Sequence, residues 1–152
     1  MDANPKGDTD TDGLARPLPK LTPLNRDFWS CGAEDELRIL HCGACGDYIH
    51  PPAPLCPGCL SRELSPRPVS GRGRIFSFTI NHHRWRESIE VPYVVALVEL
   101  EEQPGLRLAT NIVECPPQEV QIGMAVEVVF ERNGEVHVPL FRPCVPPHGG
   151  RD

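Results

Sequence analysis

Apolar and polar residues alternate with a period of two along most of the second half of the chain, a pattern typical of β-strands. It predicts strands over residues 74–80, 93–100, 106–113, 125–131 and 135–141. The second of these is apolar at nearly every position, so we expect it to be buried on both faces. In the fourth, Val126, Val128 and Phe130 share one face. Asn133-Gly134, a strong hairpin signal, precedes the last strand, and five strands at this spacing predict a small closed barrel.

The first half of the chain carries one helical signal and one strand. Thr22-Pro23 offers an N-cap with proline at the first helical position, and Leu24, Phe28 and Cys31 then fall on one helix face. We expect Gly32 to weaken or end this short helix. A strand over residues 36–41 runs into the first cysteine of a Cys-rich unit, and the proline-containing stretch 61–69 is expected to be a linker.

The composition excludes some classes of protein. Of 152 residues, 39% are hydrophobic and 24% are charged, and no stretch approaches the roughly 20 apolar residues of a membrane-spanning helix. The first 20 residues are acidic and lack an apolar run, so we expect no signal peptide, a cytoplasmic location and no membrane contact. The net charge of −6 disfavours a generally basic surface for nucleic acid.

The most specific motif is a pair of C-x2-C turns, Cys42-Gly-Ala-Cys45 and Cys56-Pro-Gly-Cys59. In a reducing compartment such cysteines are expected to be metal ligands or thiols rather than disulfides. Each turn presents two sulfurs to one side of an ion, and four sulfurs complete the tetrahedral coordination of zinc with no open position. We therefore predict one structural Zn2+ ion held by Cys42, Cys45, Cys56 and Cys59.

Two other interpretations of these cysteines stay open. A pair of redox disulfides would be followed by a helix, and none is expected after either turn. An iron ion accepts the same four sulfurs and would make the protein a coloured electron carrier. His41 and His50 lie near the motif, but with four cysteines available we do not expect them to be ligands.

Further motifs follow one another in a characteristic order. They are Phe28-Trp29, the four-Cys unit, Gly71-x-Gly73-x-Ile-Phe-Ser77-Phe-Thr79, Pro92-Tyr93-Val-Val-Ala-Leu-Val98-Glu-Leu100, Ile122-Gly123-Met124-x-Val126-x-Val128-x-Phe130 and Pro139-Leu-Phe141-Arg142-Pro143. Over about residues 22–144 the chain resembles the zinc-ribbon plus OB-fold proteins associated with acyl-CoA metabolism. The resemblance implies a mainly β fold, with an N-terminal short helix and a rubredoxin-like zinc ribbon followed by a five-stranded OB-fold barrel. One departure is Leu60, because many relatives have Gly directly after the fourth Cys.

The pattern and the resemblance together divide the chain into five parts. We expect a disordered acidic tail over residues 1–21, a helix over 22–35, the zinc ribbon and linker over 36–69, the OB-fold domain over 70–144 and a flexible C-terminus over 145–152.

The resemblance also implies a function. Members of this family are small partner subunits of thiolase-fold thiolases, acyltransferases and aldolases that shorten steroid side chains. In such complexes the thiolase-like subunit carries the chemistry, while the small subunit stabilises it and helps to line the channel for the CoA thioester. We therefore expect a non-catalytic subunit of a hetero-oligomer. Retro-aldol cleavage of a β-hydroxyacyl-CoA, as in steroid side-chain degradation, is favoured over thiolysis or acyl transfer.

Two sets of residues are candidates for contacts with CoA and with the partner. Guanidinium groups bind phosphate well, and we expect Arg72, Arg74, Arg84 and Arg86 to cluster around the first barrel strand as a local basic patch. These four are the candidates for CoA binding; a solvated strand edge is the equal alternative. Large aromatic side chains make the best interface anchors, and the candidates are Phe28, Trp29, Trp85 and Phe141. His82-His83 is expected in a connecting loop rather than as an acid–base pair, because adjacent strand residues face opposite sides.

A single-stranded nucleic-acid-binding zinc-ribbon OB-fold protein is the alternative function. OB barrels bind single strands with stacking aromatic side chains along a basic groove. The net charge and the small number of aromatic residues (five Phe, two Trp and two Tyr) argue against this function. The arginines between Arg72 and Arg86 keep it open.

Overall fold

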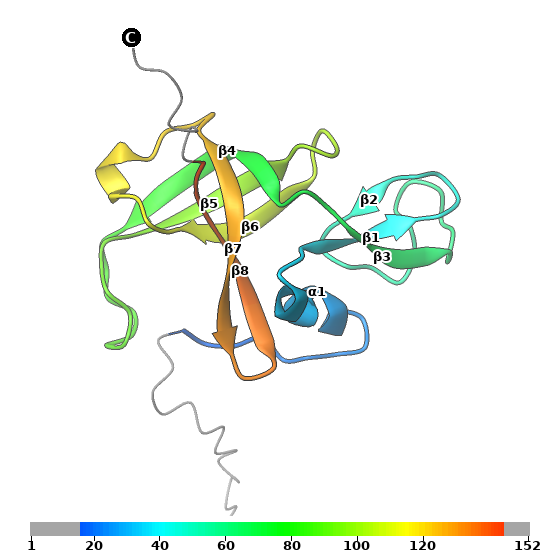
Figure 1. Cartoon of the computed structure of the whole chain (residues 1–152), viewed down its shortest axis with the longest axis horizontal. Helices are drawn as coiled ribbons and strands as arrows, with labels where there is room; N and C mark the ends of the chain where they lie inside the picture. Colours follow the sequence, from blue (N-terminus) through cyan, green and yellow to red (C-terminus); the bar gives the residue numbers. More distant parts are fainter. Residues whose placement is uncertain (1–15, 145–152) are drawn as a thin grey trace, which may run out of the picture.

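A computed structural model describes residues 16–144 as a small three-stranded sheet beside a closed barrel (Figure 1). The first secondary-structure elements are the helix α1 (Arg26–Ser30) and the 3-10 helix η1 (Cys31–Glu34). The sheet follows, in the order β2-β1-β3, with β1 at Arg38–Cys42, β2 at Tyr48–Ile49 and β3 at Leu64–Pro68. Among the described residues, no helix is long and apolar enough to cross a membrane.

The barrel is closed by five strands in the order β4-β5-β6-β8-β7. They are β4 (Arg72–Asn81), β5 (Tyr93–Leu100), β6 (Arg107–Ile112), β7 (Ala125–Asn133) and β8 (Val136–Pro143), with the 3-10 helix η2 (Pro117–Glu119) between β6 and β7. All neighbouring pairs are antiparallel except β6 and β8. The expected fold class is therefore confirmed, and each predicted barrel strand lies within two residues of the observed bounds.

The barrel core is filled by the inward-facing residues of all five strands. Val126, Val128 and Phe130 share the inner face of β7, as the alternation predicts. The hairpin between β7 and β8 is also confirmed, with Gly134 at a positive φ of 64° in its turn. Phe141 of β8 is completely buried.

β5 is buried on one face only. Val94, Ala96, Val98 and Leu100 point into the core, whereas Val95 and Leu97 are 38% and 39% exposed. The prediction that this strand is buried on both faces is therefore wrong. Every strand of a closed barrel has one face that points outward, and on β5 this face stays partly exposed within the described chain.

The predicted linker over residues 61–69 contains the strand β3, so this prediction is also wrong. β3 pairs antiparallel with β1, with Leu40 opposite Pro66 and Arg38 opposite Pro68. Proline cannot donate a backbone hydrogen bond, but it is tolerated on an edge strand if its nitrogen faces away from the neighbour. β3 pairs with β1 alone in its sheet, and the two prolines stand two residues apart, which permits this arrangement.

Residues 16–21, which the sequence assigns to the tail, lie against the barrel. Arg16 donates hydrogen bonds from Nε to Glu131 Oε1 (2.8 Å) and from Nη1 to Asn111 Oδ1 (2.7 Å). Leu18 and Leu21 pack against the buried cluster of Val136, Val138 and Leu140. This segment contains apolar side chains that can be buried against the barrel. The acidic residues on which the prediction of disorder depends cannot be buried in this way. The rest of the predicted tail, residues 1–15, and the predicted flexible C-terminus, 145–152, lie outside the described residues.

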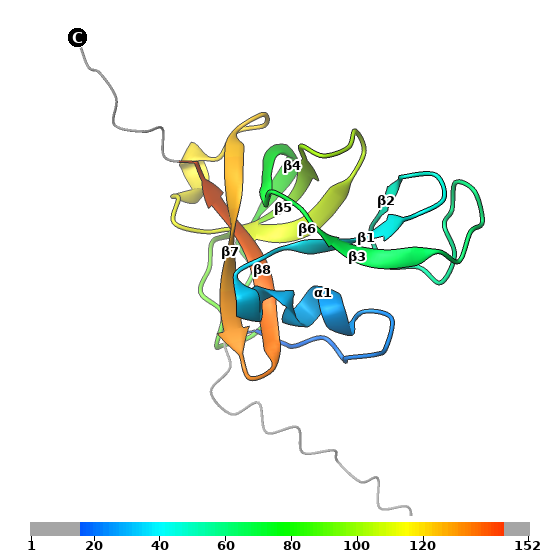
Figure 2. The same ribbon diagram turned by 45° about the vertical axis from the view of Figure 1, so that its right-hand side comes forward.

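The two short helices pack on the barrel beside the β7–β8 hairpin (Figure 2). Phe28 and Cys31 are buried, but Leu24 is 46% exposed, so two of the three residues predicted for the inner helix face reach the core. The α-helix ends before Gly32 and continues as a 3-10 turn. A Cβ atom at position 32 would lie 2.5 Å from Cβ of His137 and 2.5 Å from Cδ1 of Phe130. Glycine is therefore required by close approach of the hairpin.

We expect Gly32→Ala to destabilise the protein by about 2–3 kcal/mol, because overpacking here displaces both the helix and the hairpin. Urea unfolding of the full chain measures this change. The matched control is Gly43→Ala, whose new Cβ meets no atom nearer than 3.4 Å. Equal stability of the two variants would contradict the packing argument.

Candidate metal site and neighbouring surfaces

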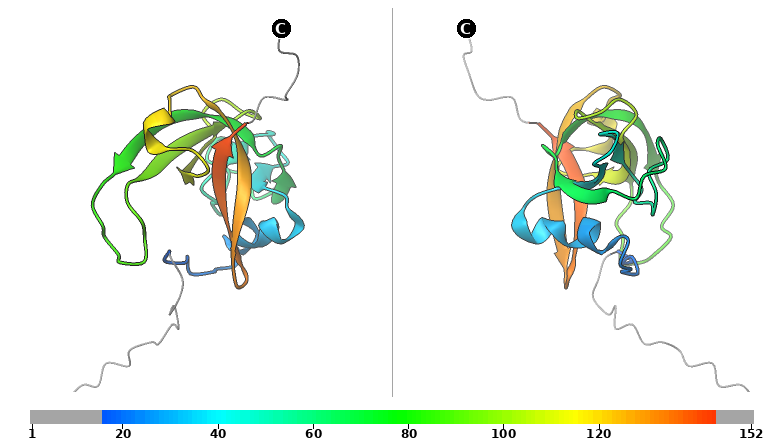
Figure 3. Two further views of the ribbon diagram at one scale, coloured as in Figure 1. Left: turned by 60° about the vertical axis from the view of Figure 1, so that its left-hand side comes forward. Right: turned by 90° about the vertical axis from the view of Figure 1, so that its right-hand side faces the viewer.

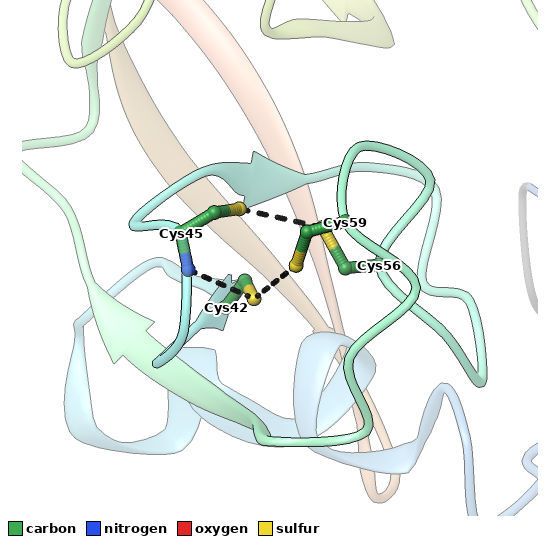
Figure 4. A group of neighbouring side chains, drawn as sticks. All are labelled: Cys42, Cys45, Cys56 and Cys59. Atoms are coloured by element: carbon green, nitrogen blue, oxygen red, sulfur yellow. Dashed lines mark hydrogen bonds between the residues drawn. The ribbon is translucent and has the colours of Figure 1, made fainter.

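The structure brings the four predicted cysteine ligands together at one end of the ribbon sheet (Figure 4). Cys42 ends β1, Cys45 lies in the turn before β2, and Cys56 and Cys59 lie between β2 and β3. All four Sγ atoms lie within 4.8 Å of one another, and the Cys42–Cys59 and Cys45–Cys56 Sγ pairs are 3.6 Å apart. Sulfurs that surround a zinc ion at about 2.3 Å are about 3.8 Å apart, so the donor set fits a tetrahedral ion.

The two C-x2-C turns have the same backbone structure. The N–H of Gly46 donates to the carbonyl oxygen of Cys42 (2.9 Å), and the N–H of Leu60 donates to that of Cys56 (2.8 Å). Gly46 and Leu60 occupy equivalent left-handed positions, with φ of 83° and 65°. The departure noted at Leu60 therefore leaves the second turn intact, at the expense of a strained backbone conformation.

The first turn favours the metal-binding form of Cys42. The backbone N–H of Cys45 donates to Sγ of Cys42 (3.5 Å), and this hydrogen bond lowers the pKa of Cys42 to about 6. Burial and the neighbouring thiols raise the pKa of Cys45 and of Cys59, so in the metal-free cluster one thiolate is shared among thiols. The thiolate is the form of cysteine that binds metals. Because four cysteines complete a tetrahedron, the site offers a bound ion no position for substrate or water.

Neither of the histidines near the motif joins the group of ligands found among the described residues. The His41 ring packs edge-on against Tyr48, with ring centroids 4.9 Å apart. His50 packs against Phe28 with ring centroids 4.8 Å apart, and burial lowers its pKa to about 4. Its imidazole is therefore neutral at pH 7.

A groove of about 570 Å³ lies where α1, the ribbon and the barrel meet. Phe28, Trp29 and His50 line one side, and Ala109 and Leu140 lie on the barrel side. This volume is within the range of about 300–1,000 Å³ that is typical of small-molecule sites. No pattern in the sequence indicates the groove itself, because it forms only where three elements far apart in the chain meet. Phe28-Trp29 is the one signal that pointed toward it.

The four candidate arginines do not form one patch. Arg72 and Arg74 stand at the beginning of β4, whereas Arg84 and Arg86 lie in the connection that follows its other end, drawn in green in Figure 3. A strand of this length spans about 30 Å. The clustering assumed for these residues is therefore wrong, and phosphate binding by either pair stays a prediction.

The four candidate interface aromatics differ in exposure. Phe28 is 8% exposed and Phe141 is 0% exposed, because both side chains fill the core. Trp29 is half-buried and packs edge-on against Phe28, with ring centroids 4.9 Å apart. Trp85 is 71% exposed. Phe28 and Phe141 therefore do not lie on the surface that the interface prediction assumed, while contact of Trp85 with a partner stays a prediction.

In the connection between β4 and β5 (residues 82–92), local contacts hold the exposed side chain of Trp85 in place. Trp85 Nε1 donates to Asn81 Oδ1 (3.2 Å), and its ring lies edge-on to His83 with centroids 4.3 Å apart. As expected from the sequence, His82 and His83 lie in this loop, after the end of β4. The loop presents a large aromatic side chain rather than an acid–base pair.

We expect Leu60→Gly to stabilise the metal-loaded protein by about 1 kcal/mol, because glycine adopts a positive φ without strain and the leucine side chain is exposed. The matched variant Gly46→Leu should destabilise by a similar amount, although a Cβ at position 46 meets no atom within 4 Å. Chemical unfolding of both variants tests the pair. Changes of the same sign would contradict the equivalence of the two turns.

Two models of known protein families together match most of the described chain. The family model for "ChsH2, rubredoxin-like zinc ribbon domain" matches residues 29–65, and that for "ChsH2, C-terminal OB-fold domain" matches residues 66–131. The boundary between the two matches lies within β3, which is the last strand of the ribbon sheet.

Curated relatives match this chain over different shares of their own length. A probable enoyl-CoA hydratase alpha subunit of Thermomonospora curvata is 40% identical over 146 residues, which cover 93% of this chain and 45% of that protein. A DUF35 domain-containing scaffold protein of Methanothermobacter thermautotrophicus is 40% identical over 93 residues, covering 60% of this chain and 68% of that protein. This chain thus spans less than half the length of the first of these relatives.

Two further relatives have names that describe CoA thioester enzymes. The 3-oxo-4,17-pregnadiene-20-carboxyl-CoA hydratase alpha subunit of Mycobacterium tuberculosis is 36% identical and covers 81% of this chain and 38% of that protein. The benzoylsuccinyl-CoA thiolase subunit BbsA of Thauera aromatica is 27% identical and covers 64% of this chain and 66% of that protein.

A solved structure named Ltp2-ChsH2(DUF35) aldolase contains a chain of the same fold. It superposes with a TM-score of 0.77 at 37% identity and covers 84% of this chain and 100% of that chain. The matched domains, the sequence identity and the shared fold agree with the geometry of the four cysteines and the barrel. The chain belongs to the ChsH2-type DUF35 family, whose members join a rubredoxin-like zinc ribbon to an OB-fold domain.

Proposed function

We propose that this chain is a non-catalytic partner subunit of a thiolase-fold enzyme that acts on acyl-CoA thioesters. The observation that carries the proposal is the match to the whole length of a chain in the Ltp2-ChsH2(DUF35) aldolase, at 37% identity. The name of the Thauera aromatica relative, a thiolase subunit, gives further support. The closed cysteine site provides no open metal position for catalysis, so the catalytic base belongs to the partner in this proposal.

The favoured reaction is retro-aldol cleavage of a β-hydroxyacyl-CoA, as in steroid side-chain degradation. The bond between the α and β carbons breaks, the carbon that bears the hydroxyl becomes a carbonyl, and the α carbon takes up a proton to leave a shorter acyl-CoA. The aldolase named above supports this reaction over thiolysis or acyl transfer. The hydratase names belong to proteins of which this chain spans only 45% and 38%, so they give hydration less support.

The groove beside α1 supports the part of the proposal that places acyl-CoA at a channel shared with the partner. Its walls are mainly apolar, and the buried imidazole of His50 is neutral, so the groove suits an uncharged acyl or pantetheine chain. The CoA phosphates would need exposed cations, for which Arg72 and Arg74 on β4 are candidates.

The proposal includes one structural zinc ion in the ribbon. Four cysteine sulfurs at tetrahedral spacing and the match to a zinc-ribbon family model support it. We also retain the cytoplasm as the compartment, because a reducing environment keeps such thiols available to a metal.

We expect Cys56→Ser to abolish zinc binding and to unfold the ribbon, because metal binding supplies the folding free energy of such units. Elemental analysis and limited proteolysis of the full chain measure both effects. Cys115→Ser is the matched control, since Cys115 lies outside the ligand group. Unchanged metal content and stability in Cys56→Ser would refute the site, and iron in place of zinc would refute the proposed ion.

The test of the proposed function is purification of the tagged full-length chain from its native host, followed by mass spectrometry. We expect a thiolase-fold protein at near-equal amounts, and none with an unrelated protein that carries the same tag. Recovery of the chain alone would contradict the subunit proposal. If nucleic acid co-purifies with the chain, and this binding weakens steeply as the salt concentration rises, the result would favour the alternative function.

A further inference from the structure

The outer face of the barrel carries apolar side chains where water-exposed strands usually carry polar ones. On β5, Val95 and Leu97 point outward and are 38% and 39% exposed. Leu97 stands opposite Ala109 of β6, which is exposed as well. Val95, Leu97 and Ala109 form a small apolar surface on two paired strands, and it is flanked by their polar cross-strand partners Ser77 and Thr79 on β4 and Asn111 on β6.

Phe76 extends this surface from β4. It is 46% exposed and lies at an irregularity where the register of β4 shifts between Ile75 and Ser77, the latter opposite Leu97. The guanidinium carbon of Arg107, on β6, lies 3.6 Å from the centroid of the Phe76 ring. Because β5 lies between β4 and β6, the ring and the guanidinium must meet across the outer side of β5. We call the surface formed by Phe76, Val95, Leu97 and Ala109 the outer apolar face.

The charges beside the outer apolar face are paired within the chain. Arg107 Nε lies 3.0 Å from Glu99 Oε2, and the two residues are cross-strand partners. The same guanidinium covers one side of the Phe76 ring. Binding of single-stranded nucleic acid needs available cations and free aromatic surfaces, so this face is poorly suited to it. An apolar surface with a neutral, paired rim suits a folded protein instead.

Within residues 16–144, the short helices border this face only at Ala109, which also lines the groove beside α1, and they leave Phe76, Val95 and Leu97 exposed. α1 and η1 pack against β8, and η1 also contacts β7, on the part of the barrel that Figures 1 and 2 show next to the ribbon. The exposure of Phe76, Val95 and Leu97 agrees with this placement. Exposed apolar patches of this kind on a folded protein mark interaction sites.

Net charge favours a different protein over a second copy of this chain. Each copy has a net charge of −6, so pairing of identical chains brings like net charges together. A stable interface buries about 800 Å² on each partner, which is more than four partly exposed side chains offer. The interface must therefore extend past the rim, and Trp85, 71% exposed in the β4–β5 connection, is the next exposed large apolar side chain along this hairpin.

We propose that the outer apolar face is the surface on which the thiolase-fold subunit docks. The inference rests on the function proposed above and adds the place of contact: Phe76, Val95 and Leu97 at the centre, with the Arg107–Glu99 pair at the rim. The complementary surface on the partner is apolar at its centre. This places the main contact on the barrel rather than on the zinc ribbon.

The test is a titration of the full-length chain with the thiolase-fold protein that co-purifies with it. Val95→Arg and Leu97→Arg place a charge at the centre of the face and should each weaken binding by at least about 30-fold. The control is Leu60→Arg, which changes a leucine 71% exposed on the ribbon and should alter the Kd less than about threefold. Melting temperature and metal content verify that each variant folds. If an arginine variant does not fold, Leu97→Ser is used in its place.

The outcomes separate this inference from the proposed function. If the wild-type chain binds the thiolase-fold protein and the face variants bind it equally well, the docking surface is wrong while the subunit role stands. If Leu60→Arg alone loses binding, the ribbon is the docking surface. If the wild-type chain binds no thiolase-fold protein, both proposals fail. Saturable binding of octanoyl-CoA to the isolated chain that Leu97→Arg abolishes would make the face a lipid site and overturn the docking proposal.

Discussion

The ribbon depends on four cysteine sulfurs that stay within 4.8 Å of one another. Its own buried cluster consists of Cys42, Ile49 and Cys56, so two of its three members are the ligand residues themselves. A unit with so little apolar surface does not fold on packing alone, and a bound metal supplies the missing free energy. The position of His50 against Phe28, and with it one wall of the groove, depends on this unit being folded.

The features that could be predicted from the sequence are those determined by residues close together in the chain. The C-x2-C spacing determines which sulfurs can share an ion, and alternation with a period of two determines the barrel strands. Gly32 shows the limit of local reasoning, because its close contact is with Phe130 and His137, about a hundred residues away. β3 was missed for a similar reason, since its prolines are acceptable only because the strand lies at a sheet edge.

The surfaces were harder to predict than the ligands. A run such as Val94 to Val98 looks the same whether its second face meets a protein interior or a partner, so the exposure of Val95 and Leu97 required the closed barrel. In the same way, proximity in sequence placed Arg72 and Arg84 together, whereas they lie beyond opposite ends of most of the ten-residue strand β4. Aromatic residues were chosen as anchors by type alone, and two of the four prove to be core residues.

The described chain combines a closed metal site, an apolar groove and an uncovered apolar barrel face. A closed four-sulfur site holds the fold and offers no catalytic position. The groove and the face offer contact surface without a paired acid and base. These properties suit the proposed role of a subunit that positions and stabilises another protein, and several relatives are named as subunits or scaffolds.

The most direct measurement is turnover of a β-hydroxyacyl-CoA by this chain alone, by the thiolase-fold protein alone and by the two at equal concentration. Separation of the CoA thioesters by liquid chromatography and their identification by mass spectrometry give the products. The account predicts no product from this chain alone, and faster formation of a shorter acyl-CoA and a carbonyl product from the mixture than from the partner alone. Product formation by this chain alone, or a mixture no faster than the partner, would contradict it.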